Sequence, residues 1–100
     1  MEYTKTVNGS EMVISMEGRL DTETAPRFEQ EIMPELTTIS SLVLDLSELE
    51  YTSSAGLRVL LALKKVMSGK GGDLCVKNVS ESLLSIFHIA GFDIILNIQS

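Results

Sequence analysis

The sequence predicts a single α/β domain over residues 1–100, with a mostly parallel, mixed five-stranded sheet, an antiparallel edge strand and about three covering helices. Two observations carry this prediction. Short apolar runs alternate with segments of helical periodicity in the order β-β-α-β-α-β-α-β, without a linker, repeat or low-complexity segment. A chain of 100 residues with 44% hydrophobic content can also bury one core.

The chain is predicted to begin with an antiparallel hairpin. Asn8-Gly9 separates two strands, residues 3–7 and 12–16, and this dipeptide accepts the positive φ angles of a tight turn. The first strand should form the sheet edge. Gly18 and Asp21 are expected to break the second strand.

A first helix should follow this hairpin. Thr22 or Thr24 can cap it, and Pro26 is tolerated in its first turn. Pro34 cannot continue a regular helix, so this one is expected to end or kink near Met33.

Residues 42–65 form the stretch around which the domain is organised. An apolar strand, residues 42–46, is expected to be covered on both faces. A polar turn should follow, and a helix is predicted from about Ser54 to Met67. The turn then lies at the carboxyl edge of the sheet, where open α/β folds place ligands and modifications.

The remaining residues predict two strands and a third helix. Residues 74–76 read as a strand that buries the thiol of Cys75, the only cysteine. Ser80 should cap the helix and Gly91 should end it. Residues 94–98 are expected to form the last strand.

The composition restricts the partners. A net charge of −6 disfavours direct binding to nucleic acid or to an anionic membrane, and favours a protein with a basic patch. No apolar run approaches the ~20 residues that span a bilayer, so we expect no membrane insertion and a cytoplasmic location. We expect a monomer or a weak dimer.

Three motifs resemble one known family in order and spacing over nearly all of the chain. They are Gly18-Arg19-Leu20-Asp21 followed by Ala25, Asp45-Leu46-Ser47, and Ser54-Ala55-Gly56-Leu57. The sequence is similar to STAS domains, and among them to bacterial anti-sigma factor antagonists. The resemblance implies a non-enzymatic protein without a cofactor, which binds an anti-sigma factor of the serine kinase type and so releases a sigma factor. The alternative is a constitutive STAS subunit of a signalling or transport complex.

Ser54 is the candidate phosphorylation site. Unpaired N–H groups and the positive end of the helix dipole would stabilise a phosphate there. On the residues alone, an ordinary N-cap is the favoured interpretation of Ser54. The resemblance implies phosphorylation, because Ser54 lies two residues before the helix-opening Gly56, as the phosphorylated serine of these antagonists does. Many phosphorylated members carry aspartate before that serine; here Ser53 stands there and is a competing acceptor.

The resemblance also implies a partner-binding surface around this turn. Its candidate residues are Asp21, Asp45, Ser53, Ser54, Gly56, Leu57, Arg58 and Leu61. Both aspartates are expected near the same end of the sheet, and turn or cap chemistry is their alternative role. The apolar surplus on the side of Leu57 and Leu61 should pack within the domain or remain exposed for docking.

The sequence does not favour phosphate binding by a glycine-rich loop, catalysis or metal binding. The glycines of Gly69-Lys70-Gly71-Gly72 follow a helix and lack the spacing of a phosphate-binding loop. His88, the only histidine, lies between apolar neighbours and suggests a structural role. An enzyme with Ser54 as nucleophile would need the glycine two residues before it that a nucleophile elbow uses, and Thr52 stands there. No residues repeat at metal-ligand spacing.

Overall fold

The structure, a computed structural model, describes residues 1–99 and the side chains of all of these except residues 93 and 99. The strands are β1 (Glu2–Asn8), β2 (Glu11–Leu20), β3 (Ser41–Thr52), β4 (Asp73–Lys77) and β5 (Asn97–Gln99). The helices are α1 (Ala25–Ile32), α2 (Ser54–Gly69), α3 (Glu81–Ile89) and α4 (Phe92–Ile95), and a 3-10 helix, η1 (Met33–Thr38), continues α1.

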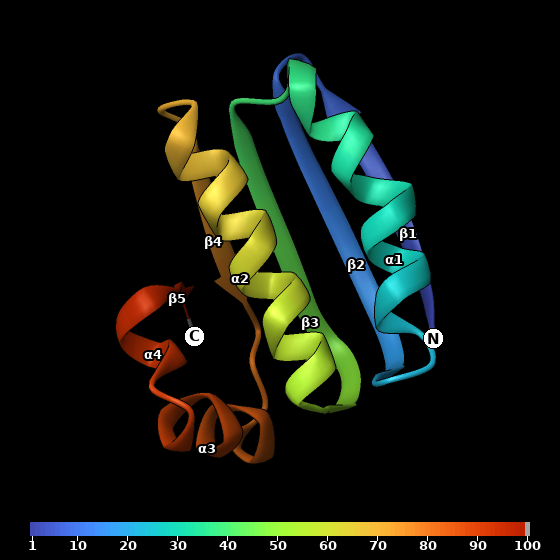
Figure 1. Cartoon of the computed structure of the whole chain (residues 1–100), viewed down its shortest axis with the longest axis vertical. Coiled ribbons are helices and arrows are strands. Elements are labelled where there is room, and N and C mark those ends of the chain that lie inside the picture. The colour runs from blue at the N-terminus through green and yellow to red at the C-terminus, as the bar shows by residue number, and fades with distance from the viewer. Residues whose placement is uncertain (100) are drawn as a thin grey trace.

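The predicted mixed sheet is confirmed. Its strands lie in the spatial order β1-β2-β3-β4-β5, β1 pairs antiparallel with β2, and every other neighbouring pair is parallel (Figure 1). The turn between β1 and β2 contains Gly9 at a φ of +64°, as the Asn8-Gly9 dipeptide predicts. Pro34 lies at the start of η1, so the expected end of α1 near Met33 is also confirmed.

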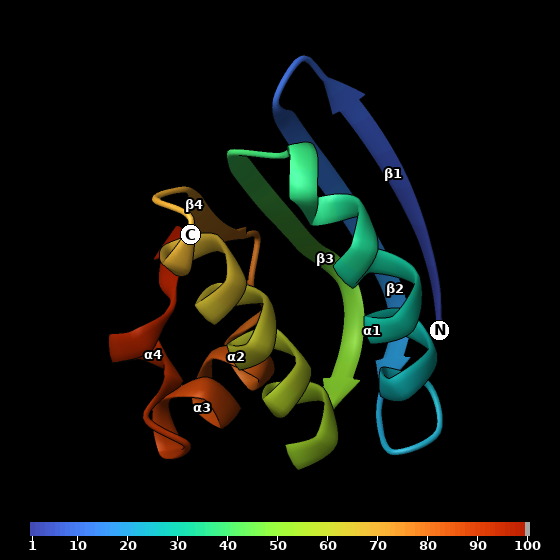
Figure 2. The ribbon, with the colours of Figure 1, turned by 45° about the horizontal axis from the view of Figure 1, so that its top comes forward.

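The expectation that the strand of residues 42–46 is covered on both faces is wrong. Two views place α1 and α2 on the same side (Figures 1 and 2). Along β3 the residues facing the helices, such as Leu42 and Leu44, are fully buried, whereas Val43 and Asp45 are only half-buried. Cys75 pairs with Val43 on the open face and is half-buried, so its thiol is less protected than predicted.

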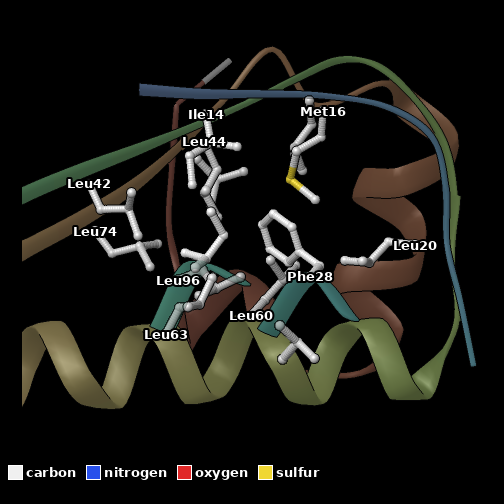
Figure 3. Close-up of a cluster of buried hydrophobic side chains, with 14 of the residues drawn as sticks. Ile14, Met16, Leu20, Phe28, Leu42, Leu44, Leu60, Leu63, Leu74 and Leu96 are labelled. Carbon is white, nitrogen blue, oxygen red and sulfur yellow. The ribbon is translucent and has the colours of Figure 1, made fainter. Parts of the chain in front are cut away.

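The core fills the space between the sheet and its helices. Phe28 of α1 lies between Met16 of the sheet and Leu60 of α2 (Figure 3), and all three side chains are buried. Tyr3 of β1 closes the edge of this core, with its ring edge-on to Phe28 at a centroid distance of 5.1 Å. Burial raises the pKa of Tyr3 to about 12, and its hydrogen bond to Glu31 adds to the effect.

Two strands run further than predicted. Residues 47–52 were expected to form a polar turn, but they continue β3 as far as Thr52, paired with the end of β2. Their polar side chains are compatible with a strand because one sheet face is open to solvent. Gly18 does not break β2 either; it lies within the strand at a φ of +90°, next to a register shift between Gly18 and Arg19.

The C-terminal apolar run divides into two elements. Gly91 ends α3 with a φ of +78°, as predicted, but the chain then makes the short helix α4, and the strand begins only at Asn97. Ile94 and Ile95 are therefore helical, which corrects the prediction. A short apolar run has no periodicity that distinguishes a strand from one helical turn.

Candidate functional site

The candidate site lies where β2 and β3 end and α2 begins, at the lower end of the molecule in Figure 1. Leu20 and Thr52 are register partners there. The carbonyl oxygen of Leu20 accepts two hydrogen bonds, from the Ser53 N–H at 3.0 Å and from the buried Thr52 hydroxyl at 3.1 Å. These bonds hold the last residue of β3 and the N-cap of α2 against the end of β2.

Gly56 allows α2 to approach this junction closely. A Cβ atom at Gly56 would lie 2.2 Å from Thr52 Oγ1 and 2.5 Å from the Leu20 carbonyl oxygen. Neither distance leaves room for a carbon atom, so any other residue would displace the helix or the strand end. Glycine at this position therefore sets where α2 starts relative to the sheet.

The two serines before Gly56 have different environments. Ser53 is the N-cap of α2, but its hydroxyl makes no capping bond, and its oxygen is buried without a hydrogen-bond partner. Ser54 is the first helical residue and is exposed. The alternative that Ser54 is the N-cap is therefore wrong by one residue. Of the two candidate acceptors, only Ser54 presents its side chain to solvent.

The start of α2 is suited to a negative charge. The first intrahelical hydrogen bond in this turn runs from Leu57 N–H to the Ser53 carbonyl at 3.0 Å, so the N–H groups of the preceding helical residues have no intrahelical acceptor. No acidic residue lies in the first turn of α2. Arg58 is exposed and lies four residues after Ser54, a spacing that places both on one helix face.

Asp21 lies at the same end of the domain but is engaged locally. Its Oδ1 accepts hydrogen bonds from the N–H groups of Glu23 at 3.0 Å and Thr24 at 3.2 Å. The bond from Thr24 N–H is the main reason that the pKa of Asp21 is lowered, and Arg19, 3.9 Å away, adds to it. The predicted turn chemistry of Asp21 is thus present, and its other carboxylate oxygen faces Arg19.

Asp45 does not lie with Asp21, contrary to expectation. It pairs with Ser15 in the middle of β2, whereas Asp21 follows the Leu20–Thr52 pair at the strand end. At about 3.3 Å per residue, roughly 20 Å of strand separates the two positions. Burial raises the pKa of Asp45, but hydrogen bonds from Ser47 N–H at 3.0 Å and the Asn78 amide at 3.1 Å outweigh it and lower the pKa.

The apolar candidates on α2 are largely internal. Leu57 is only 9% exposed, so the surplus apolar surface packs within the domain at this residue, and Leu61 is half-buried. A groove of about 300 Å³ lies on another side of α2, between the first turns of α1 and α2. It is lined by Ala25, Pro26, Glu29, Ala55, Arg58 and Val59. Sequence reasoning missed the contribution of α1, because no local pattern indicates which helix lies next to Ser54.

Comparison with known proteins identifies the family. The sequence family described as "Mlab, STAS domain" matches residues 4–97. This chain belongs to the STAS domain family. The chain is 28% identical over 93 residues to the anti-sigma-B factor antagonist of Bacillus subtilis (strain 168). These residues make up 93% of this chain and 85% of that protein.

Solved STAS structures have the same fold. An anti-sigma factor antagonist from Mycobacterium paratuberculosis superposes with a TM-score of 0.86 at 28% identity, over 97% of this chain and 83% of that one. The unphosphorylated form of SpoIIAA superposes with a TM-score of 0.78 at 15% identity, over 99% of this chain and 88% of that one. At that identity the second likeness concerns the fold alone.

Among residues 1–99, no helix is long and apolar enough to cross a bilayer. The side chains that the structure describes include no group of three or more His, Cys, Asp or Glu residues that could hold a metal ion. The candidate site is a surface at one end of the domain, around the exposed Ser54.

Proposed function

We propose that this STAS domain is an anti-sigma factor antagonist that binds an anti-sigma factor of the serine kinase type through the Ser54 end of the domain. Phosphorylation of Ser54 lowers the affinity for that partner. The observation that carries the proposal is the contrast between the two serines, because Ser54 is exposed at the start of α2 while the Ser53 hydroxyl is buried.

The proposed switch is electrostatic and steric. A phosphoserine brings about −1.5 to −2 charges at pH 7. At Ser54 it would meet the unpaired N–H groups of α2 and lie beside Arg58, which would stabilise the phosphorylated form. The same phosphate would add bulk and charge next to Ala55 and Arg58, which line the groove between α1 and α2 where the partner is proposed to dock. Only the unmodified protein would then occupy the anti-sigma factor and release the sigma factor.

The similarity to named antagonists supports this proposal. The Bacillus subtilis relative, at 28% identity, is named for antagonism of an anti-sigma-B factor. SpoIIAA, another anti-sigma factor antagonist, has been solved in unphosphorylated and phosphorylated forms, and this chain has the same fold.

The first test is phosphosite mapping by mass spectrometry of protein isolated from its native cell, with and without phosphatase. The proposal expects one phosphate, at Ser54. An anti-sigma factor that co-purifies is then titrated with the Ser54→Asp and Ser54→Ala variants by calorimetry. Ser54→Asp should weaken binding about tenfold or more, and Ser54→Ala should preserve it. Equal affinity of the two variants would refute the switch.

Ser53→Ala is the matched control, because it removes a hydroxyl that is buried and does not alter the exposed acceptor. It should still be phosphorylated at Ser54. A phosphate that disappears with Ser53→Ala but persists with Ser54→Ala would assign the site to Ser53.

A constitutive STAS subunit is the second candidate. Ser53 favours it, since it stands where many phosphorylated members carry aspartate. An unmodified mass throughout growth and stress, together with a stable complex that contains no kinase, would support this candidate instead.

A further inference from the structure

One face of the sheet is covered by α1 and α2, which lie together on the same side (Figures 1 and 2). On the opposite, open face, the outward side chains of β2, β3 and β4 are exposed or half-buried. The strands from β2 to β5 are parallel. Parallel sheets almost always have both faces covered. The open face is therefore a surface on which a partner would complete the usual layering.

The centre of the open face is apolar. Val13, Val43 and Cys75 are register partners on β2, β3 and β4, so their side chains form one row across the sheet. All three are half-buried. Thr6 of β1 extends the row, because it pairs with Val13. The row offers a flat strip of small apolar side chains.

Carboxylates flank this row on both sides. On one side, Glu11 and Asp73 both pair with Ser41 of β3, and both are exposed. On the other side, Asp45 follows Val43 by two residues and so lies on the same face. A partner that covers the apolar row therefore meets negative charge at both of its edges.

Beyond Asp45 the carboxylates are crowded. Glu17 is the register partner of Glu2 on β1 and of Glu48 on β3, which places like charges side by side. The pKa of Glu17 is raised, chiefly by its hydrogen bond with Glu2 and also by the negative charges of Glu2 and Glu48. Directly opposed like charges destabilise a sheet. A cation from a partner would relieve this repulsion.

Few cations of this chain balance these carboxylates. Among the described residues, Lys77 pairs with Asp45, and Arg19 lies over the Tyr51 ring at 4.3 Å from its centroid. Lys5 of β1 points away from the open face and bonds to the carboxylate of Glu35 in η1. The open face thus combines an apolar centre with an excess of negative charge.

We propose that the open face binds a protein partner that presents an apolar strip flanked by lysine or arginine side chains. The strip covers Val13, Val43 and Cys75, and the cations meet the carboxylates on both sides of this row. Nucleic acid and anionic membranes carry the wrong charge for this face. A second copy of this chain would bring the same carboxylates together. The surface differs from the Ser54 site, so the inference does not rest on the proposed function.

Photo-crosslinking of the full chain in its native cell tests the proposal. The crosslinker p-benzoylphenylalanine replaces Ser15, an exposed residue of the open face, or Gln30, an exposed residue of α1 that serves as the control. The first position should give an adduct with a protein whose crosslinked peptide contains lysine or arginine beside apolar residues. The proposal is overturned if position 15 gives no adduct through growth and stress. It is also overturned by an adduct with nucleic acid or with a second copy of this chain, or by the same adduct from both positions.

Charge reversal tests how the crosslinked protein is recognised. Glu17→Lys combined with Glu48→Lys should weaken its binding by about tenfold or more in calorimetry. Glu23→Lys combined with Glu81→Lys is the matched control, because it changes the net charge equally at exposed positions outside the sheet. The control should bind like the wild type, and circular dichroism confirms that both variants are folded. Equal loss in both variants would mean that only net charge matters, and would overturn the proposal.

Cys75 reports directly on whether the open face is covered. It is the only cysteine of the chain, and its half-buried thiol lies in the apolar row. A saturating amount of the crosslinked protein should slow alkylation of this thiol by iodoacetamide about tenfold or more, because access controls the reaction. An unchanged rate overturns the proposal. Ser54→Asp should leave the crosslink and this protection unchanged, so failure of the proposed switch and failure of this proposal are distinguishable.

Discussion

Replacement of Gly56 by alanine should be among the most damaging small changes in this domain. The added methyl group would lie 2.2 Å from Thr52 Oγ1 and 2.5 Å from the Leu20 carbonyl oxygen. Thr52 cannot turn away freely, because it is β-branched and buried and its hydroxyl is hydrogen-bonded to Leu20. The Leu20 carbonyl is also held by the Ser53 N–H. The start of α2 must therefore shift away from the strand ends.

The expected loss is about 2–3 kcal/mol of unfolding free energy. Overpacking of a rigid site costs typically about 1–3 kcal/mol. Displacement of α2 also weakens the Thr52 hydrogen bond, which contributes about 0.5–1.5 kcal/mol. The better helix propensity of alanine offsets at most about 1 kcal/mol of this. For a domain of this size, the net loss corresponds to a fall in Tm of roughly 10–20 °C.

Urea unfolding followed by circular dichroism measures this loss. Gly69→Ala is the matched control in the same helix, because no atom lies within 4 Å of the added carbon. It should be neutral or stabilising by up to about 1 kcal/mol. If Gly56→Ala is as stable as the wild type, or if both substitutions cost the same, close approach at the β2–α2 junction is not what requires glycine at position 56.

The remaining predictions concern single side chains, each measured by urea or thermal unfolding. Ser80→Ala should lower the free energy of unfolding by about 1 kcal/mol, because the Ser80 hydroxyl caps α3. Ser53→Ala should be neutral or slightly stabilising, because the buried Ser53 hydroxyl has no hydrogen-bond partner. Equal effects of the two substitutions would contradict this reasoning. Phe28→Ala should cost about 3–5 kcal/mol, since Phe28 is buried between the sheet and α2; a loss below about 1 kcal/mol would mean that the core collapses around the gap. The hydrogen bond from the Thr24 N–H is the main reason that the pKa of Asp21 is lowered in the folded state. The charged carboxylate therefore stabilises the fold fully at pH values well above the ordinary Asp pKa of about 3.9, and this contribution disappears as the pH falls through the lower pKa of the folded state. Asp21→Asn should therefore destabilise the domain at pH 7 and have a diminishing effect below pH 4, and an effect independent of pH would rule out the charge as the cause.

Local sequence was sufficient to predict those features of the structure that depend on one residue and its immediate neighbours. The Asn8-Gly9 turn, the cap at Ser80 and the end of α3 at Gly91 all appear as predicted, because each depends on the φ preference or hydrogen bonding of the residue itself. The order of strands and helices was predictable for a related reason, since apolar periodicity differs between the two kinds of element.

Predictions from local sequence were wrong where contacts with residues far along the chain determine the structure. Residues 47–52 read as a turn because they are polar, yet they pair with β2 and face an open side of the sheet. The register between β2 and β3 also places Asp45 far from Asp21, although their motifs suggested one site. Registers are set by the packing of whole strands, which no single motif encodes.

The amino-acid sequence by itself determined the fold family and the order of the elements as far as α3, and it predicted the candidate residues around Ser54. Only the tertiary structure decided which of the two serines reaches solvent. Ser53 is placed at the α2 N-cap, with its hydroxyl buried, because its N–H is bound to the Leu20 carbonyl at the end of another strand and because Gly56 lets α2 lie against that strand. Exposure depends on such contacts between distant segments, so two adjacent serines that look alike in the sequence become different in the folded domain.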